Sequence, residues 1–329
     1  MQGWNNQTKP KKKFLEHKKR AKLEKDYYNQ NVELVREQKN NTVAHYSFDW
    51  AQNVSVPHFS QQPSWVYFSS LPKVHLFGIQ NEANGEQINY VLDESELLNK
   101  GINGTLSLVF NGIKQFDKGE KHLKLTCDNA VGQNKNNTTL WFLLYLVIAG
   151  YYGTVELDTM IAGHTKFSPD RSFGMIKKLY RRSTIFSKES FVKVVEESSP
   201  AGLNKVQCYE EGKGFQYLDF KVLEKYFNKL PRIGKHHHFF FESSNLGVVK
   251  VKEFVDSEWE EFDLLKDNGR EREEVIEEIR NLVFTILPPK SLSLERQIYL
   301  YEKIRPLLPE NYQNVVCPEP TINSKDLLQ

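Results

Sequence analysis

The order of secondary structure predicted between His122 and Arg182 limits the fold more than any other feature of the sequence. A short apolar strand, HLKLTC, is followed by a polar turn and a helix from about Thr138 to Ala149. A second strand, TVELDTMIAG, and a helix that begins at Asp170 come next. Parallel neighbouring strands need a crossover connection, and this order supplies one, so it predicts a parallel βαβ unit. The sequence therefore predicts an α/β fold.

Antiparallel strands are predicted before this unit. Thr42 to Trp50 alternates, with Ala44 and aromatic residues on one face and Asp49 on the other, which is typical of a half-buried strand. Further strands are predicted at WVYF (65–68), VHLFGI (74–79) and INYVL (88–92), with a hairpin turn at Asn84-Gly85 and a helix over 93–116. Together with the parallel unit, these elements predict a mixed sheet flanked by helices.

Composition favours a soluble protein with a substantial core. Of the 329 residues, 39% are hydrophobic and 26% are charged. Three separated cysteines (Cys127, Cys208 and Cys317) are too few for a disulfide framework or a four-cysteine zinc site, which favours a reducing compartment. The longest apolar run, Leu140 to Tyr152, has 13 residues. A bilayer span needs about 20, so no membrane segment is predicted.

Charge is distributed unevenly along the chain. Lys9 to Lys25 contains nine Lys/Arg and two Glu, and this basic block is predicted to be a polar helix. It is interpreted either as a nuclear-localisation or nucleic-acid arm, or as a solvated helix face. His164 to Lys193 is also basic, whereas 253–279 holds twelve acidic and three basic residues and is predicted to be a solvated helix and linker.

Three aspartates occupy comparable places in the predicted fold. Asp49 lies within the first strand, Asp128 ends a later strand, and Asp170 begins the helix after the next strand. The carboxyl ends of parallel strands meet at the crevice where α/β proteins bind ligands. Clustered carboxylates repel one another and share hard cations, and Mg²⁺ prefers a few carboxylate oxygens plus substrate phosphates. The three positions therefore predict a two-metal site for Mg²⁺ or Mn²⁺ that serves in-line phosphoryl transfer.

Two motifs in this region carry a resemblance. DNAVGQNKNN followed by GHTKFSPDRSFGMIK resembles the signature pair of a domain of unknown function found in transposon-derived eukaryotic proteins, and YSFDWAQNVSVP is similar to that domain's first-strand motif. The similarity runs from about residue 42 to about residue 190. The strand order also resembles the ribonuclease H-like fold of DDE/D transposases and integrases, an analogy at the level of the fold.

This resemblance implies that Asp49, Asp128 and Asp170, separated by 79 and 42 residues, match the acidic triad. The sequence differs from many transposases in two ways. The third acid is Asp rather than Glu, and no cysteine-rich DNA-binding module precedes the domain. The resemblance implies DNA strand cleavage and transfer, by an intact, truncated or domesticated copy. For Asp170 alone, the alternative is a helix-capping residue that follows Pro169.

Several neighbouring residues are auxiliary candidates. His164 either contacts a metal or phosphate or holds its loop by a hydrogen bond. Asn129 and Gln133 belong to a polar turn that either cradles a phosphate or simply joins strand to helix. A basic face on the helix after Asp170 either follows a nucleic-acid backbone or complements the helix dipole, and its members are Arg171, Lys177, Lys178, Arg181 and Arg182. HHHFFF (236–241) is predicted to be a partly buried strand rather than a zinc site.

The predicted organisation has a basic helical arm (1–41), a ribonuclease H-like core (42–190) and an α/β C-terminal extension of unknown role (191–329). The expected partner is DNA, with RNA as a further possibility. A homo-oligomer is compatible with the sequence. The expected location is the nucleus, and otherwise the cytoplasm. The leading hypothesis is a metal-dependent transposase-derived nuclease, and the alternative is a catalytically inactive nucleic-acid- or protein-binding module.

Overall fold

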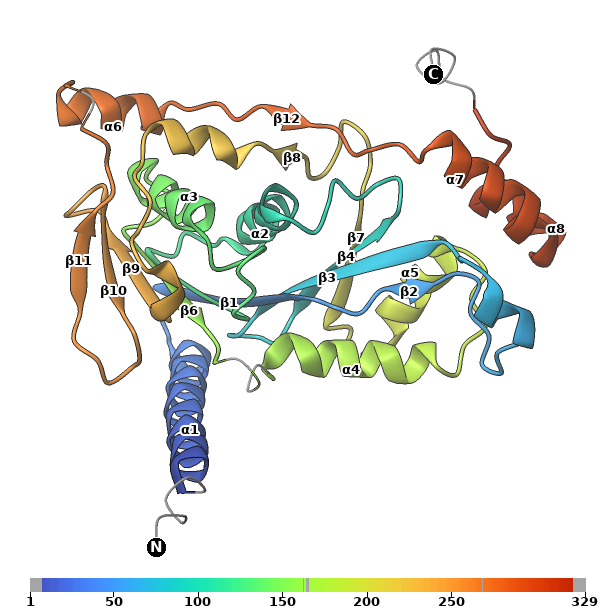
Figure 1. The fold of residues 1–329 in the computed structure, drawn as a ribbon, viewed down its shortest axis with the longest axis horizontal. Helices are drawn as coiled ribbons and strands as arrows, with labels where there is room; N and C mark the ends of the chain where they lie inside the picture. The colour runs from blue at the N-terminus through green and yellow to red at the C-terminus, as the bar shows by residue number, and fades with distance from the viewer. Residues whose placement is uncertain (1–7, 162, 164–165, 268, 322–329) are drawn as a thin grey trace, which may run out of the picture.

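A computed structural model describes residues 8–161, 163, 166–267 and 269–321, with a large mixed sheet at its centre (Figure 1). Its main strands are β1 (Val43–Trp50), β2 (Val54–Ser55), β3 (Lys73–Asn81), β4 (Gln87–Asp93), β5 (His122–Cys127), β6 (Thr154–Thr159), β7 (Asn204–Cys208), β9 (His238–Glu242), β10 (Val248–Lys252) and β11 (Glu260–Asp263). A separate small sheet pairs β8 (Tyr217–Leu218) with β12 (Ile286–Leu287).

The structure has helices on both faces of the large sheet and further helices that pack outside it. They are α1 (Thr8–Glu37), α2 (Ile102–Phe116), α3 (Asn137–Ile148), α4 (Ser168–Tyr180), α5 (Lys188–Glu197), α6 (Arg272–Arg280), α7 (Leu294–Tyr299) and α8 (Glu310–Val316). Short helical segments of other types are η1 (Ser64–Phe68), η2 (Phe220–Lys225), η3 (Ile233–Lys235), η4 (Leu300–Ile304) and η5 (Arg305–Leu307). None of the described helices combines the length and the apolar character needed to cross a bilayer.

The order and directions of the central strands confirm the predicted mixed α/β fold. Along the large sheet the order is β11-β10-β9-β6-β5-β1-β3-β4-β7, with β2 paired to β3 outside this path. Strand β1 is antiparallel to β3 and parallel to β5, and β5 is parallel to β6. The unit β5-α3-β6 is therefore the predicted βαβ crossover. This arrangement is consistent with a ribonuclease H-like sheet, in which hairpin strands adjoin a parallel unit.

Side chains that alternate along β3 separate two apolar cores. Phe77 and Ile79 belong to the larger core, which α2 and α3 cover, whereas Val74 and Leu76 belong to a second core with α4 and α5. Successive residues of a strand point to opposite faces, so a single strand supplies both cores. The hairpin predicted between β3 and β4 is confirmed, and Gly85 there has a φ of 77°, which favours glycine.

The second face of β1 is more buried than its sequence predicts. Its polar residues His45 and Ser47 are 1% and 0% exposed. Helix α1 packs against this face, and the ring of Tyr28 meets that of His45 at 5.8 Å between centroids. The alternation in β1 predicts a solvated polar face, but a helix that lies earlier in the chain covers it.

The segment after residue 190 shares the main core. Strands β9, β10 and β11 extend the sheet beyond β6, and β7 pairs with β4 at the opposite edge. The Phe220 ring lies 4.9 Å from that of Phe142 on α3. Near the end of the described chain, Leu300 and Ile304 pack with Val66 and Leu71.

Some local predictions are wrong. WVYF forms the 3-10 segment η1, with Phe68 90% exposed, instead of a strand. Helix α2 begins only at Ile102, because Asp93 Oδ1 accepts hydrogen bonds from the Ser95 and Glu96 N–H groups and makes a turn there. The apolar spacing of LDFKVLEKYFNKL (218–230) predicts a helix, but the helix that forms there is only the 3-10 segment η2. Within 253–279 the predicted helix is present as most of α6, but the predicted linker contains strand β11, whose Glu261 pairs with Lys250 of β10.

Candidate functional site

Parallel strands place two of the predicted aspartates side by side. Strands β1 and β5 pair in a register that matches Ser47 with Thr126. Continued by two residues, this register brings Asp49, near the end of β1, level with Asp128, directly after β5. Both therefore lie at the carboxyl edge of the sheet, where the sequence predicts a ligand crevice.

Helix α4 brings Asp170 to the same face. Asp170 lies in the first turn of α4, and its Oδ2 accepts a hydrogen bond from the Phe167 N–H at 3.0 Å. It is thus a capping residue, as its alternative interpretation predicts. In the hydrogen bonds among described residues, Asp170 uses Oδ2 and Asp49 uses Oδ1. Each of these carboxylates therefore keeps one oxygen for a ligand.

The charges of the three aspartates act on one another. Burial and the negative charges of Asp128 and Asp170 together raise the pKa of Asp49 to about 7, against the opposing effects of the Trp50 N–H and Lys100. Like charges disfavour ionisation of a neighbour. Such repulsion is relieved when the carboxylates share a cation, so the electrostatics fit the predicted oxygen-ligand site.

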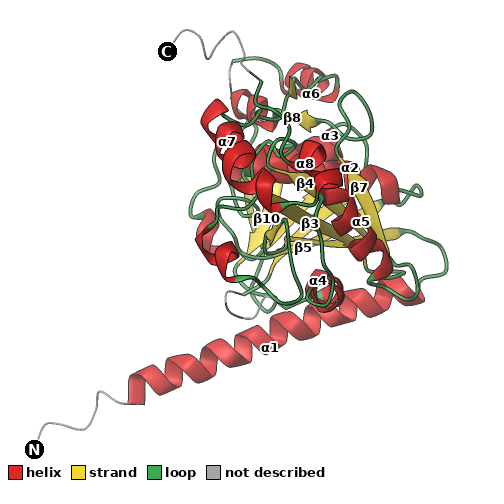
Figure 2. Cartoon of the chain, turned by 90° about the vertical axis from the view of Figure 1, so that its right-hand side faces the viewer, coloured by secondary structure: helices red, strands yellow, loops and turns green. Residues whose placement is uncertain are grey.

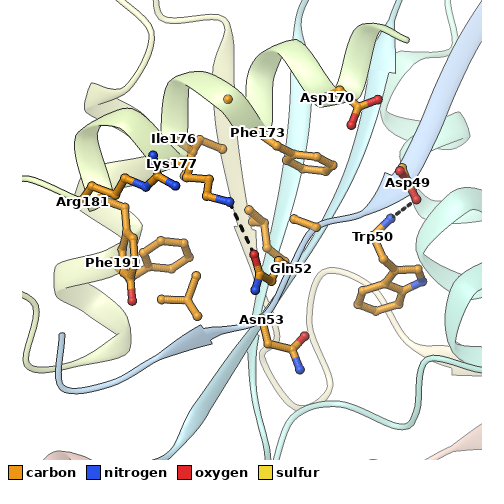
Figure 3. A pocket seen from close by; sticks show the side chains of 15 residues that line it. Asp49, Trp50, Gln52, Asn53, Asp170, Phe173, Ile176, Lys177, Arg181 and Phe191 are labelled. Carbon is orange, nitrogen blue, oxygen red and sulfur yellow. Dashed lines mark hydrogen bonds between the residues drawn. The ribbon is translucent and has the colours of Figure 1, made fainter. Parts of the chain in front are cut away.

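A pocket extends from Asp49 and Asp170 along α4 (Figure 3). Its volume is ≈ 320 Å³. Asp49 and Asp170 lie at one end, and Lys177 and Arg181 lie at the other. Phe173 of α4 faces the residues that follow β1, and Lys177 Nζ is 3.5 Å from Gln52 Oε1. One wall thus presents both acidic and basic side chains.

The polar turn after β5 holds Asp128 in place. Asp128 Oδ1 accepts hydrogen bonds from the Ala130 N–H at 3.0 Å and from Asn134 Nδ2 at 2.6 Å. The N–H groups of Gln133 and Asn134 both donate to the Ala130 carbonyl. Because these N–H groups are used inside the turn, they are not free to cradle a phosphate. The turn also orients Asp128, through the Ala130 N–H and the Asn134 side chain.

The turn also contains buried oxygens without a hydrogen-bond partner among the described residues. They are Asn129 Oδ1 and Asn134 Oδ1. A buried acceptor without a donor is costly, and amide oxygens belong to the ligand set of hard cations. Asn129 and Asn134, both from the predicted polar turn, thus add oxygen donors beside Asp128.

The other predicted site residues have different positions. His164 lies outside the described residues. Gln133 is half-buried in the turn. The predicted nucleic-acid-binding residues are all exposed on α4 or just beyond its end, namely Arg171, Lys177, Lys178, Arg181 and Arg182. Sequence reasoning missed Lys100, which donates to Asn53 Oδ1 at 2.6 Å and whose charge acts on Asp49. No spacing pattern connects Lys100 to Asp49, because the two charges come near each other only in the fold.

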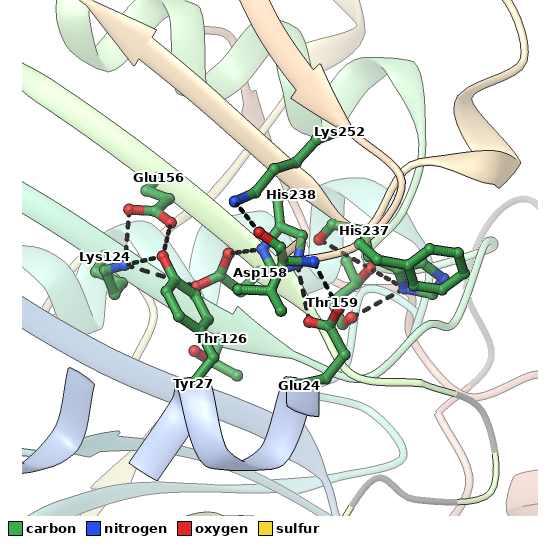
Figure 4. A network of polar contacts seen from close by, with 12 residues as sticks. Glu24, Tyr27, Lys124, Thr126, Glu156, Asp158, Thr159, His237, His238 and Lys252 are labelled. Carbon is green, nitrogen blue, oxygen red and sulfur yellow. Dashed lines mark hydrogen bonds and ion pairs between the residues drawn. The ribbon is translucent and has the colours of Figure 1, made fainter. Parts of the chain in front are cut away.

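A second ionisable cluster lies beneath α1 (Figure 4). In the part of the chain that the structure describes, the group with three potential ligand atoms within 4.8 Å of one another is Glu156, Asp158 and His238. The predicted aspartates form a more open arrangement. Lys124 Nζ already lies 2.6 Å from Glu156 Oε2 and 3.8 Å from Asp158 Oδ2. Since a lysine cation already pairs with both carboxylates of this cluster, it is a buried ion-pair network rather than a metal site.

His238 supplies the second positive charge of this network. Its Nδ1 is 2.6 Å from Asp158 Oδ1, and its Nε2 is 2.8 Å from Glu24 Oε2 of α1. Both ring nitrogens face carboxylates, so both carry a proton. Burial alone lowers the pKa of His238, but the two carboxylates outweigh burial and raise it to about 9.

Comparison with known proteins places the chain in a family. Residues 69–257, more than half of the chain, match a family described as a domain of unknown function (DUF7869). The chain belongs to the DUF7869 family. Its matched region includes Asp128, Asp170 and Lys177, whereas Asp49 precedes it.

Other comparisons add little to the DUF7869 assignment. Comparison with curated proteins gives no match. One solved structure, titled "Crystal structure of NurA", is similar at 12% identity and a TM-score of 0.18, with 92% of this chain and 67% of that chain covered. A similarity of this size carries no argument about fold or function.

Proposed function

We propose that this protein is a transposase-derived, metal-dependent enzyme of DNA strand cleavage and transfer. Asp49, Asp128 and Asp170 would hold two Mg²⁺ or Mn²⁺ ions. The observation that carries the proposal is the meeting of Asp49 and Asp128 at adjacent parallel strand ends, with Asp170 close enough for its charge to raise the pKa of Asp49. Transposon origin rests on the resemblance of the motifs alone.

The donor set fits hard divalent cations. The candidate ligands are carboxylate oxygens and the amide oxygens of Asn129 and Asn134, with no thiolate among them. Oxygen ligands suit Mg²⁺ and Mn²⁺. When bound, a pair of such ions activates the attacking water or hydroxyl and stabilises the leaving oxygen.

The chain's own residues have separable roles in this proposal. Asn134 and the Ala130 N–H hold Oδ1 of Asp128 in place. Because the carboxylate is rigid, these two hydrogen bonds also set the direction of Oδ2. Lys177 and Arg181, in the same pocket as Asp49 and Asp170, would hold the phosphates that flank the reacting one. The carboxylates would then act at one end of a bound strand and the basic residues at the other.

The direct test compares Asp128→Asn with a matched control. Asp117 also follows a regular element and accepts a hydrogen bond from an N–H two residues later, that of Gly119, but it is exposed and follows α2. Asp128→Asn is expected to abolish Mn²⁺-dependent cleavage of supercoiled plasmid and to weaken Mn²⁺ binding in calorimetry. Asp117→Asn should retain both. Full cleavage by Asp128→Asn would refute the assignment.

A catalytically inactive binding module is the second candidate. It is favoured by the open arrangement of the aspartates, which do not bring three oxygens within 4.8 Å of one another, and by the capping role of Asp170. This candidate predicts salt-sensitive binding of nucleic acid or protein without a metal-dependent product. Wild-type protein that binds DNA and yields no product in Mg²⁺ or Mn²⁺ would favour it. Parallel assays on duplex DNA, RNA and hybrids would distinguish an RNA-directed nuclease.

A further inference from the structure

Helix α1 projects from the rest of the protein. In Figure 2 its C-terminal half lies beside α4, and its N-terminal half extends away from the body. Side chains from Phe14 to Lys19 are exposed, and the first buried side chain after Phe14 is that of Ala21. Between Phe14 and Arg20 the helix has no buried side chain, so packing of the core does not account for these residues.

Buried polar contacts fix the other half of α1 to the sheet (Figure 4). Glu24 accepts from His238 Nε2 and, through Oε1, from the Val255 N–H at 2.8 Å. Tyr27 donates to Glu156 Oε1 at 2.7 Å. Burying such charges is costly unless each is paired. Each of these contacts therefore restricts the orientation of α1 relative to the sheet. The helix is therefore held in a defined direction rather than tethered loosely.

The same helix is joined to the beginning of α4, next to the candidate site. The hydroxyl of Tyr28 donates to Glu82 Oε1 at 2.7 Å, and Ser168 Oγ donates to Glu82 Oε2 at 2.7 Å. Lys25 Nζ donates to the Lys166 carbonyl at 2.8 Å. Asp170 lies two residues after Ser168, so these contacts place α1 beside the acidic cluster.

Basic residues of α1 form a line that leads to this junction. Lys18, Lys22 and Lys25 are spaced by four and three residues, so they share one face of the helix. Lys18, Lys19 and Lys22 are exposed. The exposed apolar residues Phe14, Leu15 and Leu23 spread over about half the helix circumference at 100° per residue, so they form no single face suited to a membrane surface.

We propose that α1 is a rigid arm that binds the phosphate backbone of duplex DNA beside the site, through Lys18, Lys19 and Lys22. The identity of the partner rests on the proposed function, whereas the surface itself rests on the charge and the anchoring of α1. The arm supplies affinity that does not depend on base sequence, because lysines contact phosphates as point charges. It thereby adds a contact surface separate from the basic face of α4.

The test measures binding rather than catalysis. A triple variant, Lys18→Gln, Lys19→Gln and Lys22→Gln, removes three exposed charges with little change in helix propensity. The control is a second triple variant, Lys118→Gln, Lys121→Gln and Lys205→Gln. It removes three exposed lysines that lie near the first residues of β5 and β7. Affinity of the full chain for a fluorescent 30-base-pair duplex is measured by anisotropy in EDTA over a series of salt concentrations, with single-stranded DNA, RNA and anionic vesicles as further ligands.

We expect the arm variant to bind duplex DNA more weakly and to lower the slope of log Kd against log salt concentration by about 2 to 3, since each phosphate contact contributes ~0.9. The control should keep the wild-type slope. Equal slopes for all three proteins, no binding of the wild type to duplex DNA, or preference for vesicles would each overturn the proposal. Because EDTA prevents metal-dependent cleavage, loss of the arm effect is distinguishable from failure of the proposed catalytic site.

Discussion

Replacing His238 should remove a pH-dependent part of the protein's stability. The imidazole lies between Asp158 on β6 and Glu24 on α1, and its pKa is raised to about 9 from 6.5. The charged or titratable groups around it are Glu24, Tyr27, Lys124, Glu156, Asp158, His237 and Lys252. The protonated form is therefore the one that the fold stabilises.

The size of the effect follows from the shift in pKa. One unit corresponds to about 1.4 kcal/mol, so this shift corresponds to roughly 3 kcal/mol of stabilisation. A raised pKa in the folded state means that this contribution is fully present below pH 6.5 and is lost as the pH rises through about 9. On the acid side, Lys124 and His238 outweigh burial and hold the pKa of Asp158 below its usual range, so its contribution is lost only at low pH.

Urea denaturation at about pH 6 and pH 9.5 tests this reasoning on the wild type, His238→Gln and His122→Gln. His122 is a control because its ring bonds to the Thr154 hydroxyl instead of a carboxylate. The wild type and the control should lose roughly 3 kcal/mol more than His238→Gln between these pH values. Titratable groups that are present in all three proteins contribute equally to each change in unfolding free energy, so they cancel when the changes are compared. An identical pH dependence for wild type and His238→Gln would refute the raised pKa.

Three further predictions concern packing and the site. Gly78→Ala would place a Cβ 2.8 Å from Phe173 Cζ and 2.5 Å from Gln87 Nε2, so it should destabilise the protein by about 1 to 3 kcal/mol in urea denaturation, whereas Gly174→Ala, which meets nothing within 4 Å, should not. Asn134→Leu removes the amide donor to Asp128 and should lower Mn²⁺ affinity by about 10- to 100-fold in calorimetry, with unchanged affinity counting against a role for Asn134. Phe220→Ala empties a site packed against Phe142 and Phe284 and should cost about 3 to 5 kcal/mol in a single cooperative transition, so two separate transitions would contradict a shared core.

Regular patterns explain which parts of the fold the sequence predicts. The β5-α3-β6 unit is predicted because its apolar runs have clear lengths and polar ends, and the β3-β4 hairpin because Asn84-Gly85 separates two apolar runs. The strand predicted at WVYF is wrong because residues that favour strands form one only where a neighbouring strand pairs with them. This segment has no such partner in the described structure, and Phe68 is exposed. Strand β11 is missed because its acidic composition hides the pairing with β10.

The candidate site is predictable only in part. Asp49, Asp128 and Asp170 are identifiable because strand ends and helix starts are marked in the sequence. Lys100 is not identifiable, and neither is the hydrogen bond from Asn134 to Asp128, since these relations depend on a loop conformation and on a side-chain rotamer. The charge on His238 is equally hidden, because its partners lie 80 and 214 residues away in the chain.

Strand register connects the arm to the acidic cluster. His45, Ser47 and Asp49 share one face of β1, because side chains alternate along a strand. The first of these lies against Tyr28 of α1, and the last lines the pocket beside α4. A slip of one residue would move all three to the opposite face. The register that lets α1 dock is therefore the same register that sets Asp49 beside Asp128, so docking of the arm and assembly of the acidic cluster depend on one strand pairing.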